Sequence, residues 1–91
     1  MPSMVKHFQI IVSGKVENTG FRLFALWGAS EMQINGEVWQ DNGKIFITAE
    51  GEETNLEGFA AWCRKGPSGS MVELVELHEQ KVIGHTGFKI L

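Results

Sequence analysis

The hydrophobic pattern of this chain switches between the two-residue repeat of strands and the 3.6-residue repeat of helices. Residues 5–13 follow the first repeat, with Phe8, Ile10 and Val12 on one face, and they predict a strand. Residues 21–32 follow the second repeat and predict a helix. The same patterns predict strands over 37–40 and 44–50, a helix over 54–65, and strands over 71–82 and 87–91.

The predicted order is therefore strand, helix, strand, strand, helix, strand, followed by a short C-terminal strand. A unit of strand, helix and strand occurs twice, which is typical of a ferredoxin-like sandwich. We expect an α+β fold in two layers, βαββαβ plus the terminal strand, with both helices on one face of an antiparallel sheet. At 91 residues the chain has room for one domain, over residues 1–91.

Three local signals add detail. Asn42-Gly43 between two strands is typical of a two-residue hairpin, because both residues tolerate a positive φ. Thr54 and Glu57 have the spacing of a capping box, which predicts where the second helix begins. The apolar positions over 71–82 change phase midway, as they do at a β-bulge.

The charge balance and the single cysteine exclude several classes of protein. Eight Lys and Arg against eleven Asp and Glu give a net charge of -3, so no overall basic field attracts nucleic acid or an anionic membrane. Cys63 has no partner for an internal disulfide and lies on the apolar stripe of the second helix, where we expect a core residue. With neither a leader nor a long apolar segment, we expect a cytoplasmic protein. A monomer is the default expectation.

Metal sites and RNA binding are both disfavoured by the residue pattern. His7, His78 and His85 have no Cys, Asp or His beside them at the spacing of metal ligands, so we expect no metal site. An RNA-recognition domain of similar topology would need adjacent aromatic residues on its central strands and a basic face. An acidic chain with two arginines offers neither.

The stretch from Gly14 to Gly20 is the most informative part of the chain. It lies between a predicted strand and the start of a predicted helix, and its residues accept unusual φ values. Such a turn directs successive backbone N–H groups into one concavity, where they bind phosphate together with the positive end of the helix dipole. Arg22, in the first helical turn, can grip an anion with two hydrogen bonds. The same residues also fit a tight connection with a solvated Arg22.

The loop also matches a known family motif, G-[RK]-V-Q-G-V-G-F-R. The matching positions are Gly14, Lys15, Val16, Gly20, Phe21 and Arg22. A second motif, G-x-V-x-N, falls without a gap on residues 36–40, and shorter matches follow at 49–51, 65–68 and 87–90. On these residues the chain resembles the acylphosphatases over essentially its whole length.

The resemblance implies hydrolysis of a carboxyl phosphate without a metal, a cofactor or a covalent intermediate. It implies a small acyl phosphate as substrate and inorganic phosphate as product. Carried over position by position, the resemblance implies that Arg22 binds the phosphoryl group and that Gln40 orients the attacking water. The implied phosphate-binding residues are Lys15, Val16, Glu17, Asn18, Thr19, Gly20, Phe21 and Arg22.

Several positions depart from the family motifs. Gln40 replaces the motif asparagine, and the extra methylene moves the carboxamide by roughly 1.5 Å, enough to slow the reaction. Asn18 replaces a loop glycine, which is tolerable because asparagine enters the left-handed region readily. Glu17 would repel a phosphate unless its carboxylate points to solvent or pairs with Lys15. These departures leave open an alternative function, a non-catalytic phosphate-binding module on the same scaffold.

Overall fold

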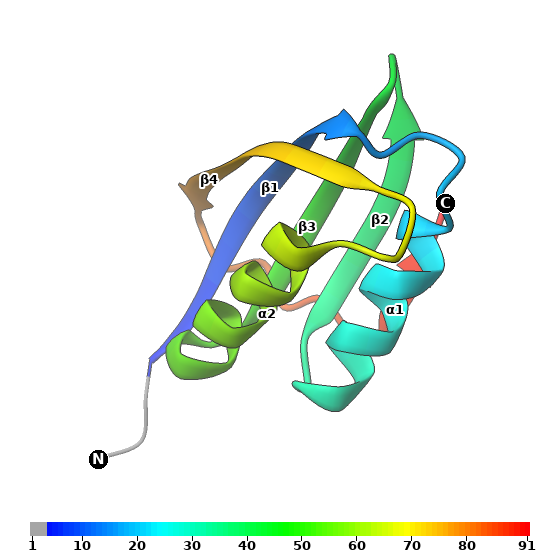
Figure 1. Ribbon diagram of the computed structural model, residues 1–91. Helices are drawn as coiled ribbons and strands as arrows, with labels where there is room; N and C mark the ends of the chain where they lie inside the picture. The colour runs from blue at the N-terminus through cyan, green and yellow to red at the C-terminus, as the bar shows by residue number, and fades with distance from the viewer. Residues whose placement is uncertain (1–3) are drawn as a thin grey trace.

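The computed structural model describes residues 4–91, in which two helices cover one face of a five-stranded sheet (Figure 1). The elements in chain order are β1 (Val5–Lys15), α1 (Phe21–Glu31), β2 (Asn35–Asp41), β3 (Lys44–Glu52), α2 (Glu53–Lys65), β4 (Met71–Gln80) and β5 (Phe88–Ile90). The strand order across the sheet is β4-β1-β3-β2-β5. This arrangement confirms the predicted ferredoxin-like α+β sandwich. Among residues 4–91, no helix has both the length and the hydropathy that a membrane crossing requires.

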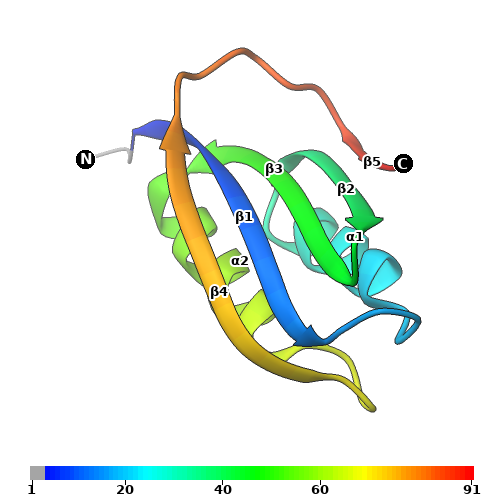
Figure 2. The ribbon, with the colours of Figure 1, turned by 90° about the horizontal axis from the view of Figure 1, so that it is seen from above.

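The sheet is mixed rather than purely antiparallel. β1 pairs antiparallel with β3 and β4, and β2 pairs antiparallel with β3, but β5 pairs parallel with β2. The reason lies in the connection from β4, which crosses to the other edge of the sheet as a long arch (Figure 2). The arch stays at the end of the sheet where β2 begins, so the strand that follows it must run in the same direction as β2.

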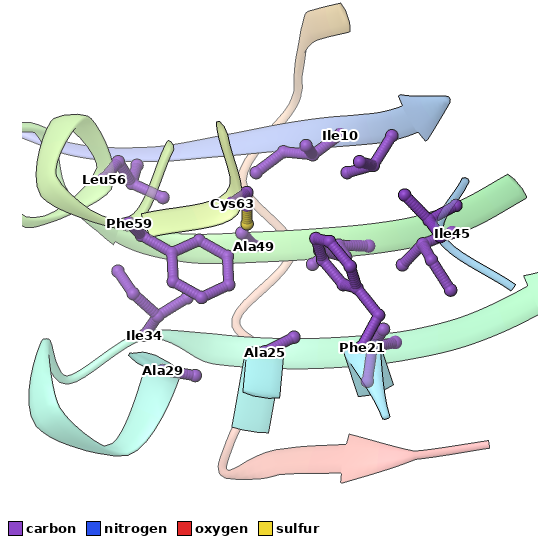
Figure 3. Close-up of a cluster of buried hydrophobic side chains, with 14 residues drawn as sticks. Ile10, Phe21, Ala25, Ala29, Ile34, Ile45, Ala49, Leu56, Phe59 and Cys63 are labelled. Carbon is purple, nitrogen blue, oxygen red and sulfur yellow. The ribbon is translucent and has the colours of Figure 1, made fainter. Parts of the chain in front are cut away.

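The core lies between the helices and the inner face of the sheet (Figure 3). Its fully buried members include Ile10, Val12, Phe21, Val38, Ile45, Ile47, Phe59 and Cys63. Burial raises the pKa of the Cys63 thiol to about 12, so the thiol stays protonated near neutral pH. The prediction that Cys63 is a core residue is confirmed.

Most of the local predictions hold, and two do not. Asn42 and Gly43 have φ values of 50° and 74° in the tight turn between β2 and β3, as predicted. The bulge is also confirmed, because Ser13 pairs with Leu74 while the next residue of β1 pairs with Val72. Residue 73 of β4 therefore has no opposite partner. β4, however, ends at Gln80 rather than at residue 82, since the chain turns there into the arch.

The predicted capping box is wrong. α2 begins at Glu53, directly after β3, and the residue before it makes no side-chain cap. The free N–H of Glu53 donates instead to the Met4 carbonyl, 2.9 Å away at the start of β1. A tertiary contact thus pairs the first N–H of the helix, and Thr54 lies exposed inside the first turn instead of at the N-cap.

The two helices meet where Gly28 of α1 faces the indole ring of Trp62 on α2. A β-carbon at Gly28 would lie 2.4 Å from two atoms of that ring, closer than any van der Waals contact. Trp62 is held in place on this surface. Its ring stacks on that of Phe24 at 4.3 Å between centroids, and its N–H donates to the Phe24 carbonyl over 2.7 Å.

Gly28→Ala should lower the free energy of unfolding by about 1–2 kcal/mol, because the new methyl group displaces Trp62 and outweighs the gain in helix propensity. Gly58→Ala on α2 is the matched control. Its methyl group would sit at an ordinary contact distance of 3.5 Å from Met32, so this variant should gain up to about 1 kcal/mol. Urea unfolding of both variants checks the pair, and equal effects would contradict the packing described.

The arch from Lys81 to Gly87 is fastened to the outer face of the sheet by a buried carboxylate. Glu50 of β3 is 3% exposed and accepts hydrogen bonds from the backbone N–H groups of Ile83 at 2.6 Å, Gly84 at 3.1 Å and His85. His7 of β1 donates from Nδ1 to the Lys81 carbonyl over 2.8 Å. His7 is itself buried, so it is a packed residue rather than an ordinary half-exposed strand residue.

Burial by itself disfavours the ionised form of Glu50, but the three backbone donors outweigh burial and hold the pKa of its carboxyl below the ordinary value of 4.5. A carboxyl with a lowered pKa stabilises the folded chain at pH values above its unfolded pKa. That stabilisation is lost as the pH falls through the folded-state pKa.

Glu50→Gln should therefore lower the thermal unfolding midpoint near pH 7, since an amide is a weaker acceptor for these donors and adds hydrogens among them. The difference from the wild type should shrink on acidification from about pH 6 to about pH 3. Glu31→Gln, at an exposed position on α1, is the control. A constant difference between wild type and Glu50→Gln across this range would contradict the role given to the carboxylate.

Candidate active site

The loop between β1 and α1 is pinned at both ends by buried apolar side chains. Val16 is 0% exposed and Phe21 is 1% exposed, and both belong to the core. Between them, the Thr19 hydroxyl donates to the Val16 carbonyl over 2.6 Å and closes the loop on itself. The remaining loop residues, Glu17, Asn18 and Gly20, are exposed.

Two of these exposed residues have left-handed backbone conformations. Asn18 has a φ of 58° and Gly20 a φ of 80°. Left-handed residues within a turn direct neighbouring N–H groups toward the same side, where they form an anion-binding concavity. The N–H of Asn18 indeed points across the loop to the side-chain oxygen of Gln40, 3.4 Å away.

The N-terminus of α1 opens into the same region. Gly20 is its N-cap and provides no side-chain acceptor, and the first helical hydrogen bond runs from the Phe24 N–H to the Gly20 carbonyl. The N–H groups of residues 21–23 therefore have no partner within the helix. No acidic residue lies in this first turn, so the positive end of the helix dipole is not neutralised by its own helix.

Loop, helix and sheet together surround a cavity of about 300 Å³. Its lining consists of Asn18, Gly20, Phe21, Arg22, Leu23, Gln40 and Ile90. Arg22 is the charged residue among them, and it is exposed on the first turn of α1. The free amides of the helix N-terminus and a guanidinium lie beside this cavity, and both are donors that bind phosphate oxygens.

Gln40, near the end of β2, reaches across to the loop with both ends of its carboxamide. Its Oε1 accepts from the Asn18 N–H, and its Nε2 donates to the Glu17 carboxylate over 3.5 Å. Within residues 4–91, Glu17 and Lys15 form no ion pair. Of the two arrangements considered for Glu17, pairing with Lys15 is thus wrong, and the carboxylate is exposed beside Gln40.

Comparison with known proteins agrees with this geometry. The family model described as acylphosphatase matches residues 8–90. An acylphosphatase of Methylococcus capsulatus is 32% identical over 89 residues, which cover 96% of this chain and 97% of that protein. The chain belongs to the acylphosphatase family. The crystal structure of acylphosphatase from Bacillus subtilis matches with a TM-score of 0.91 at 33% identity, over 97% of this chain and 99% of that one.

A second solved acylphosphatase, from Coxiella burnetii, matches with a TM-score of 0.92 at 27% identity, over 96% of this chain and 93% of that one. Acylphosphatases are hydrolases of acid anhydrides, and the predicted family and fold are both confirmed.

The structure places some of the predicted site residues on the cavity wall and others outside it. Asn18, Gly20, Phe21, Arg22 and Gln40 line the cavity. The other four predicted site residues, Lys15, Val16, Glu17 and Thr19, are not among the lining residues.

For three of those four residues the structure shows a contact that explains their position. Val16 anchors the loop in the core, Thr19 closes it, and Glu17 accepts from the Gln40 carboxamide. Lys15 is exposed at the end of β1. Asn42, which could have replaced the missing motif asparagine, is exposed in the tight turn between β2 and β3 and does not line the cavity.

Two lining residues, Leu23 and Ile90, were missed by the sequence analysis. Leu23 lies off the apolar stripe of α1 and is exposed. That combination is a weak signal, since isolated exposed apolar residues are common. Ile90 reaches the cavity through the parallel pairing of β5 with β2, which the sequence pattern did not predict.

Proposed function

We propose that this chain hydrolyses the carboxyl-phosphate bond of small acyl phosphates to a carboxylate and inorganic phosphate, by in-line attack of water without a metal. The observation that carries the proposal is the convergence of the loop, the open N-terminus of α1 and Arg22 on one cavity, with the Gln40 carboxamide on its wall. The family supports the same activity.

In this proposal the backbone N–H groups of the loop and of the first turn of α1 donate to the phosphoryl oxygens. Arg22 adds a guanidinium that can donate two parallel hydrogen bonds. Lys15 contributes positive charge from the end of β1. Donors held by the fold are already oriented toward the charge that develops on the phosphoryl group, so they stabilise the transition state without reorganising.

The chemical step needs little beyond this positioning. The water oxygen forms a bond to phosphorus while the bond from phosphorus to the acyl oxygen breaks, and the electron pair leaves with the carboxylate. A carboxylate is a weak base and departs without a proton, so neither a strong general acid nor a strong general base is required. Gln40 orients the water with its carboxamide, and the proton of the water passes to the phosphate product or to solvent.

We also propose that the chain acts as one acylphosphatase domain and as a monomer in the cytoplasm. The unpaired, buried Cys63 is compatible with a reducing compartment. The long edge strand β4 carries charged residues, Glu73, Glu76 and Glu79, which oppose edge-to-edge pairing with a second copy. Sedimentation equilibrium would test the monomer.

Arg22→Ala should reduce phosphate release from benzoyl phosphate or acetyl phosphate by at least about 100-fold, because the transition state loses its charged donor. The second arginine of the chain provides the control. Arg64, exposed in the last turn of α2, does not line the cavity, so Arg64→Ala should keep wild-type turnover.

Full turnover by a folded Arg22→Ala variant would contradict this assignment. If instead the wild type is inert toward both substrates, while inorganic phosphate raises its unfolding midpoint and fails to do so in Arg22→Ala, the chain is the non-catalytic phosphate-binding module.

Gln40→Asn should increase kcat by about tenfold. The shorter side chain releases the Asn18 N–H for the phosphoryl group and draws the carboxamide back to where the family motif has it. Gln80→Asn, the same exchange on exposed β4, should leave kcat unchanged, and Gln40→Ala should be slower than wild type. A Gln40→Asn variant no faster than Gln40→Ala would show that the carboxamide does not orient the water.

A further inference from the structure

The cavity has an apolar wall that the hydrolysis of a phosphoryl group does not use. Leu23 is 45% exposed and Ile90 is 42% exposed, and both side chains line the cavity that holds Arg22 and Gln40. The two come from opposite parts of the chain, α1 and β5. Figure 1 shows the C-terminus of the chain beside the first turn of α1, where this wall forms.

We propose that Leu23 and Ile90 form the subsite for the acyl group, and that the chain prefers apolar acyl phosphates, aromatic ones included, over short or charged ones. This inference rests on the proposed function, because it concerns the acyl group of the substrate, which the phosphate-binding residues do not contact.

The first argument is position. Leu23 follows Arg22 in the first turn of α1, so a phosphoryl group held by the guanidinium and the helix N-terminus has its acyl substituent close to Leu23. Ile90 pairs with Val38, two residues before Gln40 on the adjacent strand. Ile90 therefore comes from the strand beside the one that carries Gln40, and it lines the same cavity as Leu23.

The second argument is charge. Arg22 is the charged side chain among the residues that line the cavity, and the phosphoryl group occupies it. No second cation lies among these lining residues, so an additional anionic group on the acyl part would find no partner on this wall. An uncharged apolar acyl group is desolvated against Leu23 and Ile90 at no electrostatic cost.

The third argument is that Ile90 is held in place rather than left at a frayed end. The Gly36 N–H donates to the Gly87 carbonyl over 2.8 Å before β5, and the Leu91 N–H donates to the Val38 carbonyl over 2.9 Å after it. Asn35 accepts from the Gly87 N–H through its side-chain oxygen at 3.1 Å. A positioned apolar side chain loses little entropy when a ligand packs against it.

The test is the selectivity between benzoyl phosphate and acetyl phosphate in Leu23→Ala and Ile90→Ala. We expect the wild type to have the higher kcat/KM with benzoyl phosphate. In each variant the ratio of the two kcat/KM values should fall by about fivefold, through a raised KM for benzoyl phosphate rather than through kcat.

Leu74→Ala and Ile83→Ala are the matched controls. Both residues are exposed, at 53% and 67%, and neither lines the cavity. Their selectivity ratio should equal that of the wild type, and thermal unfolding should verify that all four variants are folded.

The outcomes separate this inference from the proposed function. Turnover with an unchanged ratio in both Leu23→Ala and Ile90→Ala overturns the acyl subsite and leaves the hydrolysis intact. If the wild type turns over neither substrate, the proposed function fails, and binding of benzylphosphonate and methylphosphonate by calorimetry decides the subsite. Tighter binding of benzylphosphonate that Leu23→Ala or Ile90→Ala weakens supports the subsite, and equal or absent binding overturns it.

Discussion

The burial of Val16 and Phe21 is the constraint on which the functional site depends. Both side chains belong to the core, so the two ends of the connection between β1 and α1 are fixed by the same packing that stabilises the sandwich. The residues between these anchors must close a short span, and they do so with left-handed conformations at Asn18 and Gly20. A loop so closed presents its N–H groups outward, because the anchors occupy the inner side. The loop geometry that we propose for phosphate binding is therefore a consequence of core packing.

A second buried contact links the far face of the sheet to the cavity. Glu50 holds the arch between β4 and β5 through three backbone N–H groups. The arch delivers β5 to the edge of β2, and with it Ile90 to the cavity wall. A buried carboxylate at a distance from the site thus helps to position a residue within it. The arrangement is stable because the hydrogen bonds to Glu50 compensate for the loss of water around its charge.

Local geometry overrides the global charge of the chain. The net charge is -3, yet the cavity combines a helix N-terminus without an acidic first turn and the guanidinium of Arg22. Glu17, whose charge opposes an anion, is exposed and faces the Gln40 amide. Gln40 in turn is long enough to touch the loop. The substitutions at these two motif positions thus contact each other, which neither departure from the motif suggested when considered alone.

The sequence by itself determined the element order, the loop, the turn at Asn42-Gly43 and the family. Periodicity, turn residues and motifs are each contained in a short stretch of neighbouring residues, so they can be recognised without the fold. Tertiary structure alone decided the rest. It decided that the Glu53 N–H is capped by the Met4 carbonyl, that β5 runs parallel to β2, and that Ile90 reaches the cavity. Each of these depends on a contact between segments distant along the chain, and no local pattern carries that information. The proposed acyl subsite belongs to this second group, because Leu23 and Ile90 come to one wall of the cavity only through the fold.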